Sequence, residues 1–78
     1  MNEIVEQYYS QILPVLLKNK MPKEPAILCL SMLADNGREE MRVRRLKELK
    51  EYLDEGNGII TPMECCEVAF GLVEKYPD

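Results

Sequence analysis

The chain has 78 residues and a mass of 9.1 kDa, which is enough for one small domain over residues 1–78. Hydrophobic residues make up 46% of the sequence and charged residues 31%, a balance that predicts a folded rather than a disordered chain. A formal net charge of -4 and a pI near 4.8 disfavour a protein whose main task is to coat nucleic-acid phosphates.

The sequence lacks the residue types and motifs on which common catalytic sites depend. There is no histidine, so the commonest general base and metal ligand is missing. The Gly56-x-Gly58 pattern lacks the lysine and the preceding strand of a phosphate-binding loop. We therefore expect a protein that is not an enzyme, that has no small-molecule substrate and that uses no cofactor.

Targeting signals are also missing. The first residues are acidic, and no apolar stretch with a small-residue cleavage site follows them. The longest apolar run, 26–30, is too short to span a membrane. We expect a cytoplasmic protein without membrane contact, in which Cys29, Cys65 and Cys66 act as small buried hydrophobic residues rather than zinc ligands.

The first predicted helix covers residues 2–19. Apolar pairs recur every four residues from Ile4-Val5 to Leu16-Leu17, which is the spacing of one helix face. Pro14 interrupts this pattern, and because proline removes one helical hydrogen bond we expect a kink just before it.

The second predicted helix covers residues 25–36 and is almost wholly apolar from Ala26 to Ala34. Pro22 or Pro25 suits its first position, and Gly37 suits a left-handed residue at its end. Such a helix needs burial on most sides.

The third predicted helix, 38–55, is highly charged. Its candidate partner-binding residues form a basic face: Arg38, Arg42, Arg44, Arg45 and Lys47. A helix that carries arginines after a glycine-containing turn resembles the recognition helix of helix-turn-helix proteins, which would imply DNA contact. Glu39, Glu40 and Glu48 lie among these arginines and would repel phosphates.

The fourth predicted helix, 62–75, begins at a capping box, Thr61-Pro62-Met63-Glu64. The preceding segment from Gly56 resembles the latter part of an EF-hand calcium loop, but the first ligand position falls on Leu53. We therefore expect a turn and a helix cap, and no metal. An acidic face on this helix is the second candidate partner-binding surface: Glu64, Glu67 and Glu74.

The second and fourth helices carry more apolar surface than four short helices can cover. A chain of this length gains little net stability from its own core, so we expect a homodimer or a stable complex with a different protein. The predicted interface comprises these residues: Leu30, Met32, Leu33, Phe70, Leu72 and Tyr76.

The predicted fold is all-α, a four-helix bundle without a sheet. The predicted function is a small soluble interaction module such as an inhibitor, an adaptor or an immunity or anti-defence factor. Phage anti-defence proteins and bacteriocin immunity proteins resemble it in size and composition. The alternative is a dimeric DNA-binding regulator that uses the basic helix 38–50. Charge is segregated: residues 18–50 carry nine basic and five acidic side chains, whereas residues 51–78 carry one basic and seven acidic.

Overall fold

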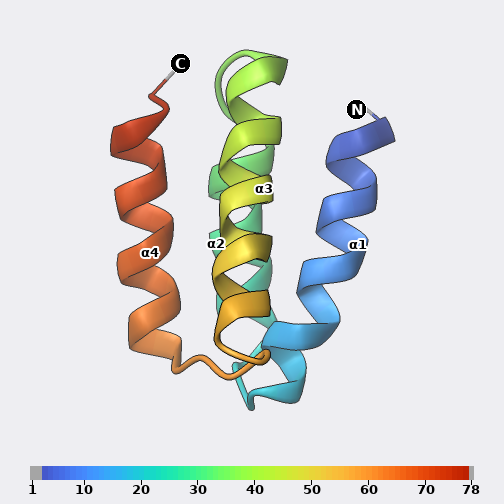
Figure 1. Cartoon of the computed structure of the whole chain (residues 1–78), viewed down its shortest axis with the longest axis vertical. Coiled ribbons are helices and arrows are strands. Elements are labelled where there is room, and N and C mark those ends of the chain that lie inside the picture. The colour runs from blue at the N-terminus through green and yellow to red at the C-terminus, as the bar shows by residue number, and fades with distance from the viewer. Residues whose placement is uncertain (1–2, 78) are drawn as a thin grey trace.

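The computed structural model describes residues 3–77, and over this range it contains four helices and no strand. The helices are α1 (Glu3–Lys18), α2 (Lys23–Ala34), α3 (Glu39–Glu55) and α4 (Pro62–Lys75) (Figure 1). The predicted all-α four-helix fold is confirmed. The predicted start of the first helix, at residue 2, lies outside the described residues.

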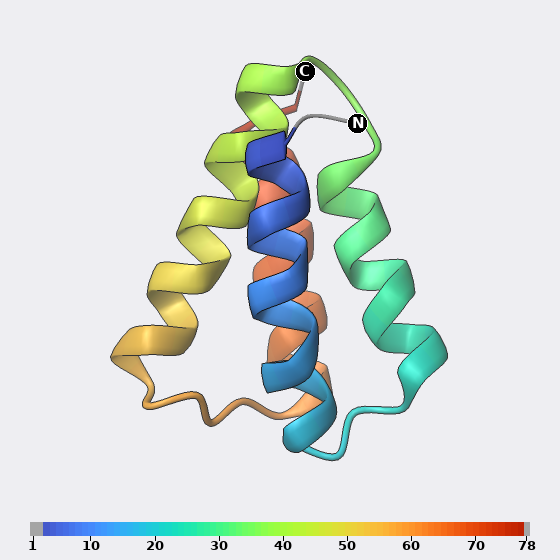
Figure 2. The ribbon, with the colours of Figure 1, turned by 90° about the vertical axis from the view of Figure 1, so that its right-hand side faces the viewer.

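The helices run alternately up and down, and α2 and α3 form the centre of the bundle (Figure 1). These two helices converge at the 35–38 turn and diverge toward their other ends, like the arms of a V (Figure 2). α1 lies on one side of the V and α4 on the other. Each contacts both α2 and α3, whereas these two outer helices make no contact with each other.

Apolar stripes from all four helices meet inside the V. α1 contributes Val5, Ile12 and Leu16, and α3 contributes Leu46, Leu49 and Leu53, with spacings of three, four or seven residues that place each set on one helix face. The remaining buried hydrophobic residues come from α2, α4 and the loops: Met21, Ala26, Cys29, Leu30, Leu33, Ala34, Ile60, Cys65, Ala69 and Leu72.

The helix ends follow local chemistry. The capping box is present: Glu64 N–H donates to Thr61 Oγ1 at 3.1 Å, and Thr61 N–H donates to Glu64 Oε1 at 3.4 Å. Gly37 has a φ of 83°, as its place after α2 predicts. The start of α2 was predicted wrongly, because Pro22 is the residue before the first turn and the helix begins at Lys23.

Pro14 lies within α1, which continues through it to Lys18. The α1 ribbon changes direction in its C-terminal half (Figure 1), in line with the expected effect of an internal proline.

The most unusual core residue is Arg45 of α3, whose side chain is 1% exposed. Its guanidinium donates to the carbonyl oxygens of Leu33 at 3.2 Å, Tyr76 at 2.8 Å and Pro77 at 3.1 Å. It also donates to the carbonyl of Asn36. The last carbonyls of a helix lack intrahelical donors and carry a partial negative charge, so this one cation satisfies the ends of both α2 and α4.

At the opposite end of the bundle, Asn19 ties α1 to the loop before α4. Its Nδ2 donates to the carbonyls of Val15 at 2.7 Å and of Gly58, while its Oδ1 accepts from Ile60 N–H at 3.2 Å. Gly58 has a φ of 72°, a left-handed conformation that favours glycine. The side-chain amide of Asn19 therefore holds this loop against the end of α1.

We predict that Arg45→Lys destabilises the protein by about 2 kcal/mol, because an ammonium cannot reach all four carbonyls and leaves buried acceptors unpaired. In a domain of this size, such a loss lowers the melting temperature by roughly 8–16 °C in thermal denaturation followed by circular dichroism. The matched control is Arg44→Lys, an exposed neighbour with only an i,i+4 partner, which should change stability by less than about 0.5 kcal/mol. Equal melting temperatures for the two variants would contradict the role given to Arg45.

Candidate functional site

One of the five residues of the predicted basic face of α3 does not lie on the surface. The structure corrects the prediction for Arg45, which is buried, because its position falls on the same stripe as Leu49, four residues later. Arg44 pairs with Glu40 at 2.9 Å, and Arg42 Nε donates to the Gly37 carbonyl at 2.8 Å. Of the remaining predicted residues, Arg38 precedes the first turn of α3 and Lys47 is exposed.

Polar side chains join α3 to the C-terminal end of α4. Glu48 accepts hydrogen bonds from Tyr76 Oη and from Lys75 Nζ, the latter at 3.0 Å, and these two bonds lower the pKa of the Glu48 carboxyl below its usual range. Lys75 Nζ also lies 5.4 Å from the centre of the Tyr76 ring. Tyr76 was predicted in a dimer interface, but it is half-buried and bound within the chain.

A second polar contact joins the same two helices at their other end, where Tyr52 Oη donates to a carboxylate oxygen of Glu64. Glu64 is therefore engaged both by Tyr52 and by the capping box. Glu67 and Glu74, the other predicted acidic residues, are exposed, and within residues 3–77 neither carboxylate has a hydrogen-bond or ion-pair partner. The outward acidic surface of α4 is thus reduced to these two residues.

The predicted dimer interface is also corrected. Leu30 and Leu33 are fully buried and Leu72 is 6% exposed, so these three side chains fill the core of their own chain. The apolar helix α2 packs against α1, α3 and α4. The inward-facing side chains of α2 are therefore covered by helices of the same chain. Met32 is half-buried, and Phe70 remains 61% exposed.

Cysteine side chains lie where α2 and α4 pack against each other, along a line of contact that we call the seam. The sulfur atoms of Cys29 and Cys66 lie 3.8 Å apart, and Cys65 is buried beside them on α4. Burial raises the pKa of Cys29 to about 12, and it raises the pKa of Cys65 as well. The predicted burial of the cysteines is confirmed for Cys29 and Cys65, whereas Cys66 is half-buried where α2 and α4 meet.

Large apolar side chains remain uncovered on both sides of this seam. Leu28 of α2 is 69% exposed, and Met63 and Phe70 of α4 are 73% and 61% exposed. On α4 the positions 63, 66, 70 and 73 follow helical spacing and form a stripe beside the buried one. We call this surface the α2–α4 face; it comprises Leu28, Met32, Met63, Glu67, Phe70, Val73 and Glu74.

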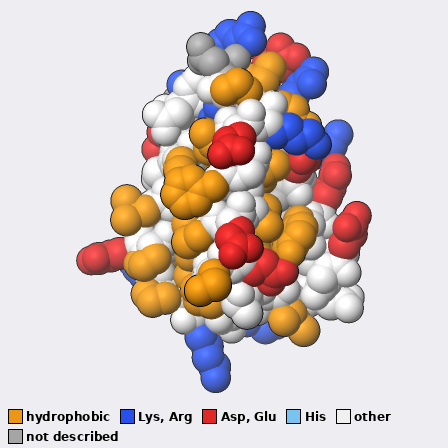
Figure 3. All heavy atoms as spheres, turned by 90° about the vertical axis from the view of Figure 1, so that its left-hand side faces the viewer, with side chains coloured by type: hydrophobic (Ala, Val, Ile, Leu, Met, Phe, Trp, Pro, Cys, Tyr) orange, Lys and Arg blue, Asp and Glu red, His pale blue; other side chains and the backbone are white. Residues whose placement is uncertain are grey.

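Figure 3 shows this side of the molecule, with hydrophobic side chains spread over it and acidic side chains among them. Sequence reasoning identified Met32, Phe70, Glu67 and Glu74 but missed Leu28, Met63 and Val73. Met63 was hidden within the capping-box motif, although its spacing of seven residues from Phe70 could have placed both on one stripe.

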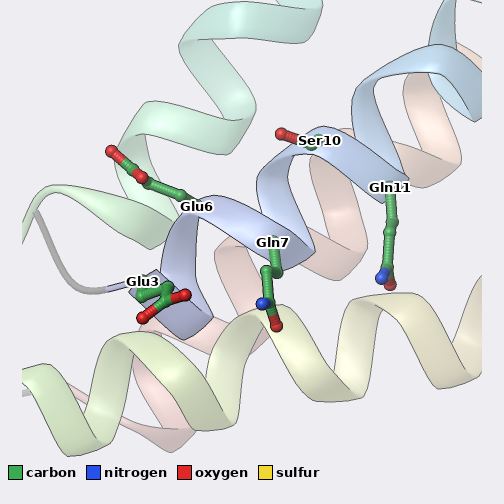
Figure 4. Close-up of a pocket in the computed structure, with 5 residues that line it drawn as sticks. All are labelled: Glu3, Glu6, Gln7, Ser10 and Gln11. Atoms are coloured by element: carbon green, nitrogen blue, oxygen red, sulfur yellow. The ribbon is translucent and has the colours of Figure 1, made fainter.

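One hollow lies between α3 and the residue after α4, and polar side chains line it: Arg44, Lys47, Glu48, Glu51 and Tyr76. A second hollow, on α1, is lined by Glu3, Glu6, Gln7, Ser10 and Gln11 of that single helix; Glu3, Gln7 and Gln11 point to one side of the helix, and Glu6 and Ser10 point to the other (Figure 4). Within residues 3–77 no cluster of three cysteine or carboxylate residues is placed to hold a metal ion. None of the helices over this range has the length and apolar character needed to cross a bilayer.

Searches against protein-family models, curated proteins and solved structures return no match for this chain. The α2–α4 face is the largest group of exposed apolar side chains described above, and it is the candidate functional site.

We predict that Cys29 and Cys65 resist alkylation in the folded protein, whereas Cys66 reacts first. With a pKa of about 12, Cys29 exposes only about one thiolate in ten thousand at pH 8, and its sulfur is also buried. Mass spectrometry after iodoacetamide treatment checks the order of modification, and the same reaction in guanidinium chloride should label all three thiols. Uniform labelling of the native protein would show that the α2–α4 seam is open.

We predict a pH-dependent stability difference between the wild type and Glu48→Gln. The pKa of Glu48 is lowered from its ordinary value of 4.5, so the charged form stabilises the fold fully above that pH. The difference should shrink as the pH falls through the lowered pKa, because the carboxyl is then protonated in both states. Urea denaturation at several pH values measures it. Glu51→Gln, an exposed α3 control, should show little difference at any pH. A difference for Glu48→Gln that does not change with pH would contradict the carboxylate's role.

Proposed function

We propose that this protein is a small interaction module that binds a partner protein through the α2–α4 face. The observation that carries the proposal is the exposure of Leu28, Met63 and Phe70, at 61–73%, on two neighbouring helices of a bundle whose core is otherwise closed. Scattered apolar residues are ordinary on protein surfaces, but a group on adjacent helices is typical of interaction sites.

The side chains on this face suit a binding role. An aromatic ring and a methionine are enriched at the centres of protein interfaces, and the flexible thioether of methionine adapts to the shape of a partner. Covering the 61% of Phe70 that remains exposed would stabilise a complex by roughly 1–2 kcal/mol. The exposed Glu67 and Glu74 add charge selectivity beside the apolar contacts.

The alternative use of the basic helix 38–50 in DNA binding has no comparable support. Arg45 is buried, Arg44 is paired with Glu40, and Arg42 binds a backbone carbonyl, so few cations of α3 point at a common surface. Contact with duplex DNA needs several cations on one face.

A contact-based role also agrees with the composition of the chain. The absence of histidine leaves little scope for acid–base chemistry, and an inhibitor, an adaptor or an immunity-type factor in the cytoplasm requires none. Such a protein works by occupying a surface of its target.

Affinity capture with three baits tests the proposal: the wild type, Phe70→Asp and Ile4→Asp. Ile4 is 50% exposed on α1, which does not contact α4, so it provides a matched exposed apolar control. We expect a protein from the producing cells that is retained by the wild type and by Ile4→Asp and is reduced at least tenfold on Phe70→Asp. Circular dichroism establishes that all three baits are folded. A partner retained equally by all three would place the binding surface elsewhere on the bundle.

A further inference from the structure

We infer that the α2–α4 face takes a basic amphipathic helix of its partner protein. This inference rests on the proposed function, because it specifies the chemistry of the partner that the same face would bind. Two independent features lead to it, the charge of the face and its shape.

The charge of the face is mainly acidic. Glu67 and Glu74 flank the stripe that contains Phe70, and Glu24 and Asp35 are exposed at the two ends of α2, with Lys23 exposed beside Glu24. The one lysine of α4, Lys75, is turned away toward Glu48 of α3. A partner that covers the apolar stripe therefore meets carboxylates at its edges, and lysine or arginine beside its own apolar residues would neutralise them.

The shape of the face suits a helix. α2 and α4 run in the same direction side by side, in contact along the seam where the Cys29 and Cys66 sulfurs meet (Figures 1 and 2). The apolar positions of α4 from Met63 to Val73 extend over about 15 Å at the usual helical rise. A partner helix of about three turns matches this length, and apolar residues spaced three and four apart would lie along the seam.

A second copy of this chain fits the face less well. A two-fold interface brings the same patch of each copy together, which would bring Glu67 and Glu74 close to their own counterparts. Of the five cations on α3, which are half of the ten in the sequence, four already have partners: Arg42, Arg44, Arg45 and Lys50. Phosphate-bearing surfaces are disfavoured by the same carboxylates.

The test uses two synthetic 15-residue helical peptides with leucines spaced three, four and three residues apart. One peptide carries lysines beside the leucines, and the other carries glutamates at the same positions. Each is titrated into the full-length, isotope-labelled protein, and binding is followed by the shifts of backbone amide resonances. We expect the lysine peptide to shift amides of α2 and α4 and to bind at least tenfold more tightly than the glutamate peptide, with an advantage that falls as salt is raised.

Charge reversal provides the decisive comparison. The double variant Glu67→Lys and Glu74→Lys should bind the glutamate peptide more tightly than the lysine peptide. The matched control, Glu51→Lys and Glu55→Lys, changes the same number of exposed charges on α3 and should keep the wild-type preference. Phe70→Asp should abolish binding of both peptides to the face.

The outcomes separate this inference from the function on which it rests. Equal binding of the two peptides at the face, binding of neither, or amide shifts confined to α1 or α3 would each overturn the basic-helix inference. The proposed function would still stand if the Phe70-dependent capture succeeded. Light scattering that shows a dimer disrupted by Phe70→Asp would also overturn the inference, because the occupant would then be a second copy.

Discussion

One buried guanidinium on α3 determines how the C-terminal ends of α2 and α4 meet. Arg45 projects from α3 and binds carbonyl groups at the C-terminal end of α2 and just beyond the C-terminal end of α4. Without that cation, these acceptors would be buried unpaired at the point where the V formed by α2 and α3 closes. Because the same side chain holds both ends, it fixes α2 and α4 in their parallel alignment, and the α2–α4 face depends on that alignment.

Different interactions hold the two ends of the bundle together. At the end of the bundle where α2 and α3 diverge (Figure 2), the connecting loops also contribute to the core, because Met21 and Ile60 are buried. Asn19 holds the loop that carries Ile60 by bonding to its backbone. The EF-hand-like appearance of this loop in the sequence thus reflects a glycine turn and a helix cap, which need the same residue types as the end of a calcium loop.

Local patterns were enough to predict the helices but not the contacts between them. The stripe of Leu46, Leu49 and Leu53 and the Thr61–Glu64 capping box are both short-range features, and both are present. Arg45 could have been recognised as a charge on that stripe. Its acceptors could not, because they are backbone carbonyls up to 32 residues away that no side-chain pattern encodes. The apolar surplus of α2 and α4 was predicted, but its exposed part was assigned to Leu30, Leu33 and Leu72 instead of Leu28 and Met63.

The contacts of α4 with α3 differ from its contacts with α2, and this difference explains why the exposed apolar side chains of α4 lie beside α2. Toward α3, this helix is closed by polar contacts, with Tyr52 bound to Glu64 at one end and Tyr76 and Lys75 bound to Glu48 at the other. Toward α2, the contact runs through Cys29 and Cys66, whose short side chains leave the longer Phe70 uncovered. Polar contacts on the α3 side fix how α4 is rotated about its own axis, and that rotation keeps the apolar stripe beside α2 on the surface. A partner at the α2–α4 face would therefore cover apolar surface that the fold itself holds outward, without rearrangement of the helices.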